Sequence, residues 1–210
     1  LRSVFAAHDP DRFRLYAYYN NPQRTGRDPF VEARVSPRVL AGLDDAAAAA
    51  LVAADDLDLL VDLAGHTGHN RLAIFARRPA RVALTWLDYV STTGMATIDW
   101  RITDAVADPP GAGERANSER LLRLPVPAWC WTPPPQAPDP GPPPLLQEGV
   151  PTFGSFNHAQ KLTDATLASW RALFASLPAT RLVAVGVPAG TARARVAAGL
   201  GLDAARIAFA

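Results

Sequence analysis

The most conspicuous residue that could do chemistry is Lys161, because every other one of the 21 basic side chains is an arginine. It lies in the stretch FGSFNHAQKLTD at 153–164, between an expected strand and an expected helix that Thr163 can cap. A helix N-terminus attracts phosphate through its free N–H groups and partial positive charge, and a lysine beside it adds a mobile point charge. The alternative is a solvated loop lysine, the usual fate of this residue type. The pattern leaves both interpretations open.

A second polar loop, AGHTGHN at 64–70, directly follows the apolar pattern LDLLVDL. His66 and His69 raise the question of a metal. No metal site is expected, because Cys130 is distant in sequence and no further histidine or carboxylate has ligand spacing. Two interpretations remain open. The loop is either a turn whose two glycines relieve backbone strain, or the lip of a cleft where His66 and Thr67 offer hydrogen bonds to a polar ligand.

A third polar stretch, WLDYVSTTG at 86–94, follows another expected strand and contains Tyr89, Thr92 and Thr93. In open parallel sheets, ligands bind beyond the carboxyl ends of the strands. These residues are therefore expected on the same side of the sheet as the 64–70 loop, although this signal is weaker than the first two.

The elements that must position these loops alternate between strand and helix patterns. Strands are expected at 13–19, 57–63, 81–87, 152–157, 181–187 and 206–210, the second and third of them buried, and helices at 44–54, 71–77, 163–177 and from about 191. On the helix that Thr163 caps, one face carries the apolar residues Leu167, Trp170, Phe174 and Leu177. The alternation indicates an α/β fold with parallel, covered sheets.

Proline divides the chain. Eleven of the 20 prolines fall between Pro125 and Pro151, and the run TPPPQAPDPGPPP is expected to form neither helix nor paired strand, because proline lacks the donor N–H. The sequence therefore predicts a first domain at 1–125, an extended connector at 126–150 and a second domain at 151–210, with the two α/β domains facing across a cleft.

Composition excludes several classes of function. The net charge of +1 gives no basic field for nucleic acid or for an anionic membrane surface. The longest apolar run, at 46–54, is far too short to span a bilayer. One cysteine allows no internal disulfide, so a cytoplasmic setting is expected. Both ends look cut, which suggests a piece of something longer.

Several linked motifs in the right order now point to one family. The stretch DLDLLVDLAGHTGHNRLAIFARRPARVALTWLDYVSTTGMATIDWRITDAVADPP resembles the catalytic region of the O-linked N-acetylglucosamine transferase and SPINDLY family, in its bacterial form, and so does SERLLRLPVPAWCWTPP. FGSFNHAQKLTDATLASWRALFASLPATRLVAVGVP resembles the start of that family's second catalytic lobe. The resemblance implies the GT-B fold of two Rossmann-like lobes, the first nearly complete and the second only begun.

The resemblance also implies a function. The family transfers a sugar from a nucleotide diphosphate donor to Ser or Thr of proteins with inversion, and UDP-N-acetylglucosamine is the expected donor. GDP-fucose or UDP-glucose as donor, or a non-catalytic fragment that binds nucleotide sugar or protein, stay open as alternatives. The expected partners are nucleotide sugar and acceptor proteins, with neither nucleic acid nor membrane.

Two residues match the family's donor site. Lys161 matches the lysine that contacts the diphosphate and steadies the leaving group, which makes it the expected catalytic and donor-binding residue. His158 matches a donor-contacting position that is usually Gln or Asn, and this departure leaves the nucleotide preference open. No metal and no other cofactor is expected.

The cleft on the acceptor side is expected to include His66, Thr67, Tyr89 and Thr93. In the stretch WLDYV, Asp88 and Val90 replace the Gly and Pro of the family's usual WLGYP. The family's His-Pro motif would precede residue 1 and its diphosphate-binding His/Thr-rich turn would follow residue 210, so this chain alone is expected to be inactive. The family's tetratricopeptide repeats are absent from the chain and are expected, if present, upstream in the parent protein.

Overall fold

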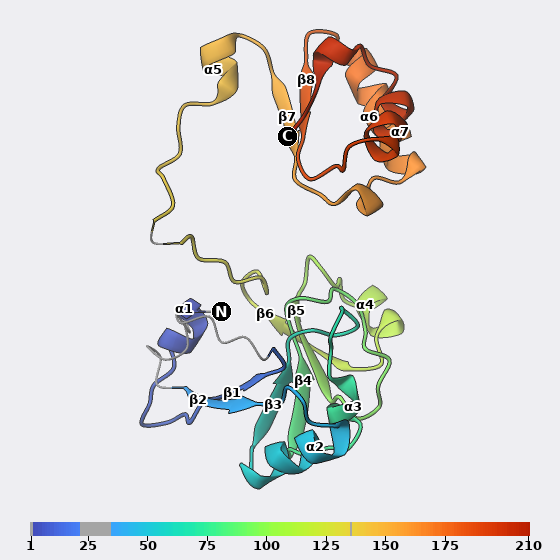
Figure 1. Cartoon of the computed structure of the whole chain (residues 1–210). Coiled ribbons are helices and arrows are strands. Elements are labelled where there is room, and N and C mark those ends of the chain that lie inside the picture. The colour runs from blue at the N-terminus through green and yellow to red at the C-terminus, as the bar shows by residue number, and fades with distance from the viewer. Residues whose placement is uncertain (1, 22–34, 135) are drawn as a thin grey trace. The chain divides into compact units, whose positions relative to one another are not determined.

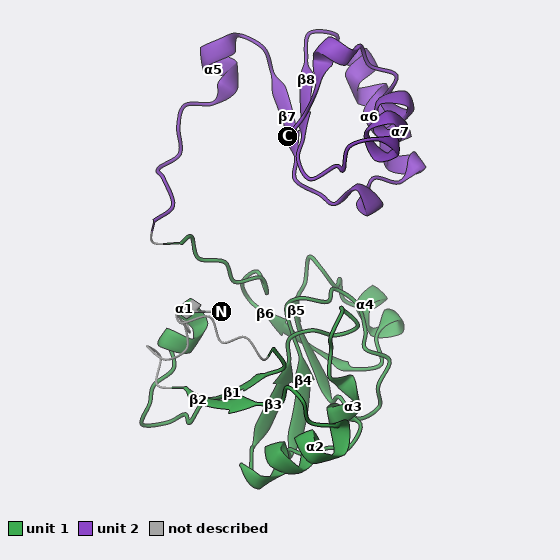
Figure 2. Cartoon of the chain, viewed as in Figure 1, with its two compact units in different colours: residues 1–135 green, residues 136–210 purple. Residues whose placement is uncertain are grey.

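The chain forms two compact units, Leu1–Pro135 and Gln136–Ala210 (Figure 2). The structure, a computed structural model, describes residues 2–21, 35–134 and 136–210. The division between the units falls within the proline-rich stretch 126–150. Each unit has its own parallel sheet and its own hydrophobic core.

Unit 1 is built around four parallel strands in the order β3, β4, β5, β6 (Figure 1). Their bounds are Leu59–Asp62, Val82–Thr85, Trp100–Asp104 and Arg120–Leu124. A separate parallel pair is formed by β1 (Tyr16–Tyr19) and β2 (Ser36–Val39). The helices are α1 (Arg2–Ala6), α2 (Asp45–Ala54), α3 (Leu72–Phe75) and α4 (Ala112–Ala116). Because the four strands run parallel, the loops after their carboxyl ends gather at one edge of the sheet.

Helix α2 forms where the sequence predicts it. The side chain of Asp44 caps it, since its Oδ1 accepts the N–H of Ala47 at 2.8 Å. Val52 is 1% exposed and belongs to the same buried cluster as Leu60 of β3 and Ala83 of β4. The apolar face of the helix and one face of the sheet therefore remove each other from water, which holds α2 against β3 and β4.

The prediction that 57–63 is a fully buried strand is wrong for one of its faces. In β3, Leu60 and Asp62 are buried, whereas Leu59 is 56% and Val61 is 38% exposed. Side chains alternate across a strand, and β3 lies at the edge of the four-stranded sheet. The side that carries Leu60 packs on α2, and within the described residues the other side is only partly covered. Strand β4, by contrast, is buried as predicted.

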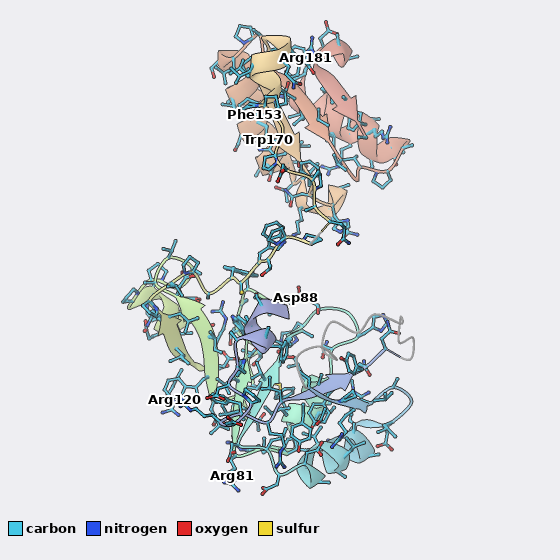
Figure 3. All side chains as sticks on the ribbon, turned by 90° about the vertical axis from the view of Figure 1, so that its left-hand side faces the viewer. Arg81, Asp88, Arg120, Phe153, Trp170 and Arg181 are labelled. Carbon is cyan, nitrogen blue, oxygen red and sulfur yellow. The ribbon has the colours of Figure 1, made fainter. Side chains whose placement is uncertain are left out.

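Strands β5 and β6 were not among the predicted elements, because charged residues interrupt their apolar pattern. Arg101 of β5 is buried in an ion pair with Asp108, with Nη1 2.7 Å from Oδ2. Arg120 of β6, labelled in Figure 3, lies over the ring of Trp100 with Cζ 3.9 Å from the ring centroid. In place of a continuous apolar run, β5 thus contains a buried ion pair, and β6 is joined to it by a cation–π contact.

Unit 2 has three parallel strands in the order β7, β8, β9 (Thr152–Ser155, Arg181–Ala184 and Ile207–Phe209). Helices α6 (Asp164–Ser176) and α7 (Thr191–Leu200) lie side by side against them (Figure 1). Two short 3-10 turns, η2 (Ala159–Lys161) and η3 (Ala204–Arg206), complete the unit. These elements follow the predicted pattern, with shorter strands.

The two helices of unit 2 approach closely at Gly199. A Cβ at this position would lie 2.6 Å from Cδ1 of Leu167, so a larger residue would force this buried side chain to shift. Leu167 and Phe174 are each 1% exposed, as the helical pattern predicts. Leu177 departs from that prediction, because it lies past the last residue of α6 and is 38% exposed.

The connector contains one short helix where only extended chain was expected. Helix α5 (Pro144–Glu148) begins on the last proline of the run, at the first helical position, where proline's missing N–H costs no hydrogen bond. It ends at Gly149, whose φ of +68° is the left-handed conformation typical of a helix C-terminus. The described prolines of the run before position 144 are consistent with the prediction, since they lie in neither helix nor strand.

Among the described residues, no helix combines the length and the apolar character that crossing a membrane requires.

Candidate functional site

The loops after β3 and β4 meet at the carboxyl edge of the unit 1 sheet, on the side where ligands bind in such folds. The imidazole Nε2 of His66 lies 2.8 Å from the backbone oxygen of Thr93. The rings of His66 and Tyr89 pack edge to face with centroids 5.3 Å apart. The structure thus brings three of the predicted cleft residues into direct contact.

Asp62, the last residue of β3, holds the start of the 64–70 loop. Its buried carboxylate accepts the N–H of Gly65 at 2.8 Å and the N–H of Ala64 at 3.1 Å. Thr85 at the end of β4 donates its hydroxyl to the same carboxylate at 2.8 Å. One side chain therefore joins the ends of two neighbouring strands and fixes the direction in which the loop leaves the sheet.

Gly65 gives the loop its shape. Its φ is +50°, and a Cβ built there would lie 2.3 Å from Cβ of Tyr89. At Gly68, three residues later, an added Cβ would meet open space, with no atom within 4 Å. The turn and the cleft interpretations of this loop are thus compatible, because the tight turn at Gly65 is what lets Tyr89 approach His66.

The other polar residues of the loop are engaged within it or at its end. Thr67 is half-buried and donates its hydroxyl to the backbone oxygen of Ala64 at 2.8 Å. His69 has a φ of +61°, and its backbone oxygen accepts the side-chain N–H of Asn20 at 2.9 Å. Within the ranges that the structure describes, no group of three or more His, Cys, Asp and Glu side chains is placed to hold a metal ion.

Glu119, next to the start of β6, is a buried residue that sequence reasoning missed. Its Oε1 accepts the N–H of Thr93 at 2.7 Å and also the hydroxyl of Thr93, while its Oε2 accepts the hydroxyl of Thr92 at 2.7 Å. Burial raises the pKa of Glu119, but the hydrogen bonds from Thr93 and Thr92 outweigh it and leave the pKa below its usual value. No local sequence pattern predicts this contact, because Thr93 and Thr92 are 26 and 27 residues away from Glu119 in the sequence.

A pocket of about 330 Å³ lies beside the 86–94 loop, and Tyr89 lines it. Its lining also includes the apolar residues Trp86, Val90 and Trp129, together with Arg101. The guanidinium of Arg101 donates to the backbone oxygen of Val90 at 3.0 Å, which ties the loop to the sheet. The volume falls in the lower part of the range that small-molecule sites occupy.

The 86–94 loop also carries backbone strain. Leu87 has a φ of +85°, a left-handed conformation that residues with a Cβ rarely adopt. The next residue, Asp88, is exposed and is labelled in Figure 3. Strain of this kind persists only where surrounding contacts impose it, and here the bond from Arg101 to Val90 lies three residues away.

In unit 2, the 157–164 loop has the predicted relation to helix α6. Thr163 caps the helix, with its hydroxyl oxygen accepting the N–H of Thr166 at 3.2 Å. Lys161 is the last residue of the turn η2, and its side chain is exposed. Its backbone N–H donates to the backbone oxygen of His158 at 2.9 Å. Over the described part of the chain, no carboxylate lies within ion-pair distance of the Lys161 ammonium.

Arg195 of α7 supports this loop through hydrogen bonds to its backbone. Its guanidinium donates to the backbone oxygens of Leu162 at 2.5 Å and Ala159 at 3.4 Å, and to Oδ1 of Asp164 at 3.0 Å. Leu162 is 1% exposed and anchors the loop in the core of unit 2. The backbone on both sides of Lys161 is therefore held while its side chain stays in solvent. The expectation that the two domains face each other across a cleft concerns two separate units and stays a prediction.

Comparison with known proteins now adds the family. The family model described as glycosyl transferase family 41 matches residues 1–127. A probable UDP-N-acetylglucosamine–peptide N-acetylglucosaminyltransferase SPINDLY from Solanum lycopersicum is 37% identical over 188 residues, 87% of this chain. Its counterpart from Arabidopsis thaliana is 44% identical over 142 residues, 68% of this chain.

A solved structure is similar over the whole chain. A mutant of the O-GlcNAc transferase from Thermobaculum terrenum is 33% identical, with a TM-score of 0.89 over 100% of this chain. The chain spans 20% and 15% of the two plant relatives and 40% of the solved protein chain. The similarity thus extends over both units, while the relatives are much longer.

Proposed function

The chain belongs to glycosyl transferase family 41, which includes the O-GlcNAc transferases and SPINDLY proteins, and from that premise we propose that it is part of an inverting protein O-glycosyltransferase. The proposed reaction moves N-acetylglucosamine from UDP-N-acetylglucosamine to a Ser or Thr hydroxyl. The hydroxyl oxygen forms a bond to C1 of the sugar, the bond from C1 to the β-phosphate oxygen breaks, and the hydroxyl proton passes to a base. UDP leaves with the additional negative charge.

The fold class expected from the sequence is confirmed. Both units are α/β with parallel strands, and the chain shares the fold of a solved O-GlcNAc transferase, which is of the GT-B type with Rossmann-like lobes. In such units, ligands bind at the carboxyl ends of the strands. The three polar loops of this chain all follow strands of that kind, which is where a donor and an acceptor can be held.

The observation that carries the proposed mechanism is the exposed ammonium of Lys161 beside the N-terminus of α6. A departing diphosphate gains negative charge in the transition state, so a cation that binds it more strongly there lowers the barrier. The brace from Arg195 supports this role, because it holds the backbone around Lys161 while the side chain stays free to reach a ligand. His158, at the other end of the turn, is proposed as a second donor contact.

We propose that no metal takes part. The leaving diphosphate needs a positive group, and Lys161 together with the free N–H groups at the start of α6 can supply it. This part of the proposal rests on the placement of the lysine and not on any missing ion.

The acceptor side is proposed to lie on unit 1. His66, Thr67, Tyr89 and Thr93 gather at the carboxyl edge of its sheet, beside the pocket that Tyr89 lines. At this edge, polar groups that can form a hydrogen bond with a hydroxyl lie next to the apolar lining of the pocket. Such a combination can bind a protein side chain together with a sugar.

The setting completes the proposal. We propose a cytoplasmic protein, since its single cysteine suits a reducing compartment. Its partners are acceptor proteins and a nucleotide sugar. Because the relatives are far longer than this chain, tetratricopeptide repeats upstream remain part of the proposal for the whole protein.

A donor panel tests the function. The whole protein that contains this chain is incubated in turn with UDP-N-acetylglucosamine, UDP-glucose and GDP-fucose in the presence of a protein extract, and mass spectrometry locates modified residues. We expect N-acetylglucosamine on Ser or Thr from the first donor. A different sugar would overturn the donor assignment, and donor binding without any modification would identify a non-catalytic relative.

A further inference from the structure

The carboxylate of Glu119 is one of the buried carboxylates that the proposed function does not use. It is 4% exposed and accepts hydrogen bonds from the N–H and the hydroxyl of Thr93 and from the hydroxyl of Thr92. Thr93 is itself 4% exposed. A buried carboxylate with several donors holds those donors firmly, because leaving either side unpaired would be costly.

Two of these bonds come from the same residue, and they orient it. The N–H and the side chain of Thr93 both point at Oε1 of Glu119, so rotation of this residue would break both bonds. The backbone oxygen of Thr93 is then directed at the other neighbour, His66, with Nε2 at 2.8 Å.

This contact determines which nitrogen of His66 carries a proton. A backbone carbonyl can only accept a hydrogen bond, so Nε2 must be the donor. In the neutral ring the lone pair is then on Nδ1, and no hydrogen bond from the described residues occupies that atom. The Tyr89 ring packs against the imidazole, with the ring centroids 5.3 Å apart.

We propose that Glu119 is a positioning residue: through Thr93 it fixes His66 as the Nε2–H tautomer and so presents Nδ1 as a hydrogen-bond acceptor. A neutral imidazole held in this way takes a ligand that donates, such as a sugar hydroxyl or the hydroxyl of a Ser or Thr side chain. The identity of the ligand rests on the proposed function, whereas the tautomer and its dependence on Glu119 do not.

The competing explanation is a purely structural carboxylate that supports the turn at 92–93 without any effect on His66. The two differ in one observable. A positioning role requires the state of the His66 ring to change when Glu119 is altered while the rest of unit 1 stays folded.

Side-chain ¹H–¹⁵N spectra of the chain labelled in histidine read this directly, at an alkaline pH where imidazole is neutral. The chain has four histidines, so His66→Gln identifies the signals of interest by their disappearance. We expect an Nε2–H of His66 that is protected from solvent exchange, with an unprotonated Nδ1. A protonated Nδ1 with a bare Nε2 overturns the proposal.

Variants test the link. Glu119→Ala is expected to abolish the protected Nε2–H, whereas Glu114→Ala, which removes a nearby exposed carboxylate that bonds Arg123, leaves it unchanged. Glu119→Gln keeps the shape and one accepting oxygen, so it is expected to weaken the protection in a chain that stays folded. If Glu119→Ala does not fold, the Gln variant decides. A His66 signal that is unchanged in the folded Glu119 variants overturns the positioning role.

Kinetics of the whole protein test the ligand contact. His66→Gln can still donate from the Nε2 position but offers no acceptor at Nδ1, so kcat/KM should fall by about tenfold, the equivalent of one hydrogen bond. An unchanged kcat/KM overturns the acceptor role of Nδ1. If no donor yields any transfer, the proposed function fails, and the spectra still decide the role of Glu119.

Discussion

Replacing Gly65 with alanine should destabilise unit 1, and the structure supplies the size of the effect. The new Cβ would sit 2.3 Å from Cβ and 2.6 Å from Cγ of Tyr89, well inside contact distance. The φ of +50° adds the cost of a left-handed alanine, about 1–2 kcal/mol. Because the nearest atom is Cβ of Tyr89, the loop backbone must shift to relieve the contact, which adds about 1–3 kcal/mol, typical of an overpacked site.

Alanine also lowers the entropy of the unfolded chain, which offsets about 0.4–1 kcal/mol. The net loss for Gly65→Ala is therefore about 1–4.5 kcal/mol. Gly68→Ala is the matched control, because the same substitution in the same loop meets no atom within 4 Å and no left-handed backbone. It should leave the free energy of unfolding unchanged or raise it slightly.

Urea unfolding followed by tryptophan fluorescence measures both variants, since four of the five tryptophans belong to unit 1. The midpoint of Gly65→Ala should fall clearly below that of the wild type, while the midpoint of Gly68→Ala should match or exceed it. Equal midpoints for the two variants would refute the packing of Tyr89 on Gly65, and with it the geometry that places Tyr89 against His66.

Three further predictions concern the other loops. In the whole protein, Lys161→Ala should lower turnover about ten- to a hundredfold, the loss of one charge-assisted contact, and Lys161→Arg should also be clearly impaired. Both variants should keep the wild-type melting temperature, because the side chain is exposed. The assay is the initial rate at saturating donor, and full activity of the arginine variant would favour a solvated loop lysine. Arg195→Ala should raise the KM for donor, because it loosens the turn that carries Lys161. Arg193→Ala, a change of the same type on the same helix, should leave this KM unchanged. Equal KM values for the two variants would contradict the supporting role of Arg195. Asp104 should make the stability of the chain sensitive to acid. The backbone N–H of Ala128 is the largest of the hydrogen-bond donors that lower the pKa of Asp104. The contribution of Asp104 to the free energy of unfolding is therefore complete above the ordinary aspartate pKa of about 4 and is lost as the pH falls through the lower pKa of the folded state. Urea midpoints measured down the pH scale should fall less steeply for Asp104→Asn than for the wild type, and parallel curves would contradict this.

The part of the fold that could be predicted from sequence is the part that local patterns specify. The helix that Thr163 caps begins where the cap and the apolar face of Leu167 and Phe174 indicate. The buried strand β4 and the alternation of strand and helix in unit 2 follow from equally local signals.

What escaped prediction depends on contacts and strand order that no local pattern shows. Strand β5 is hidden because Arg101 is buried against Asp108, and a charge of this kind reads as exposed until its partner is known. The apolar pattern predicts that Leu59 and Val61 are buried, but their strand lies at the edge of the sheet and both are exposed. A local pattern does not predict the order of strands in a sheet.

The candidate site divides in the same way. The placement of His66, Tyr89 and Thr93 near one another follows from the rule that loops after parallel strands share an edge. The role of Glu119 does not, because nothing near it in sequence indicates that two threonines from another loop donate to it. The functions of Lys161 and His158 stay proposals, and the structure contributes the exposure and bracing that they require.

The central claim is that the whole protein couples cleavage of UDP-N-acetylglucosamine to modification of a protein hydroxyl. The most direct test measures two products in one reaction, the UDP released and the N-acetylglucosamine attached to Ser or Thr, for the wild type beside Lys161→Ala. The account predicts equal amounts of the two products for the wild type and a proportional drop in both for the variant. Binding of the donor with neither product formed, or UDP release without sugar on protein, would contradict it.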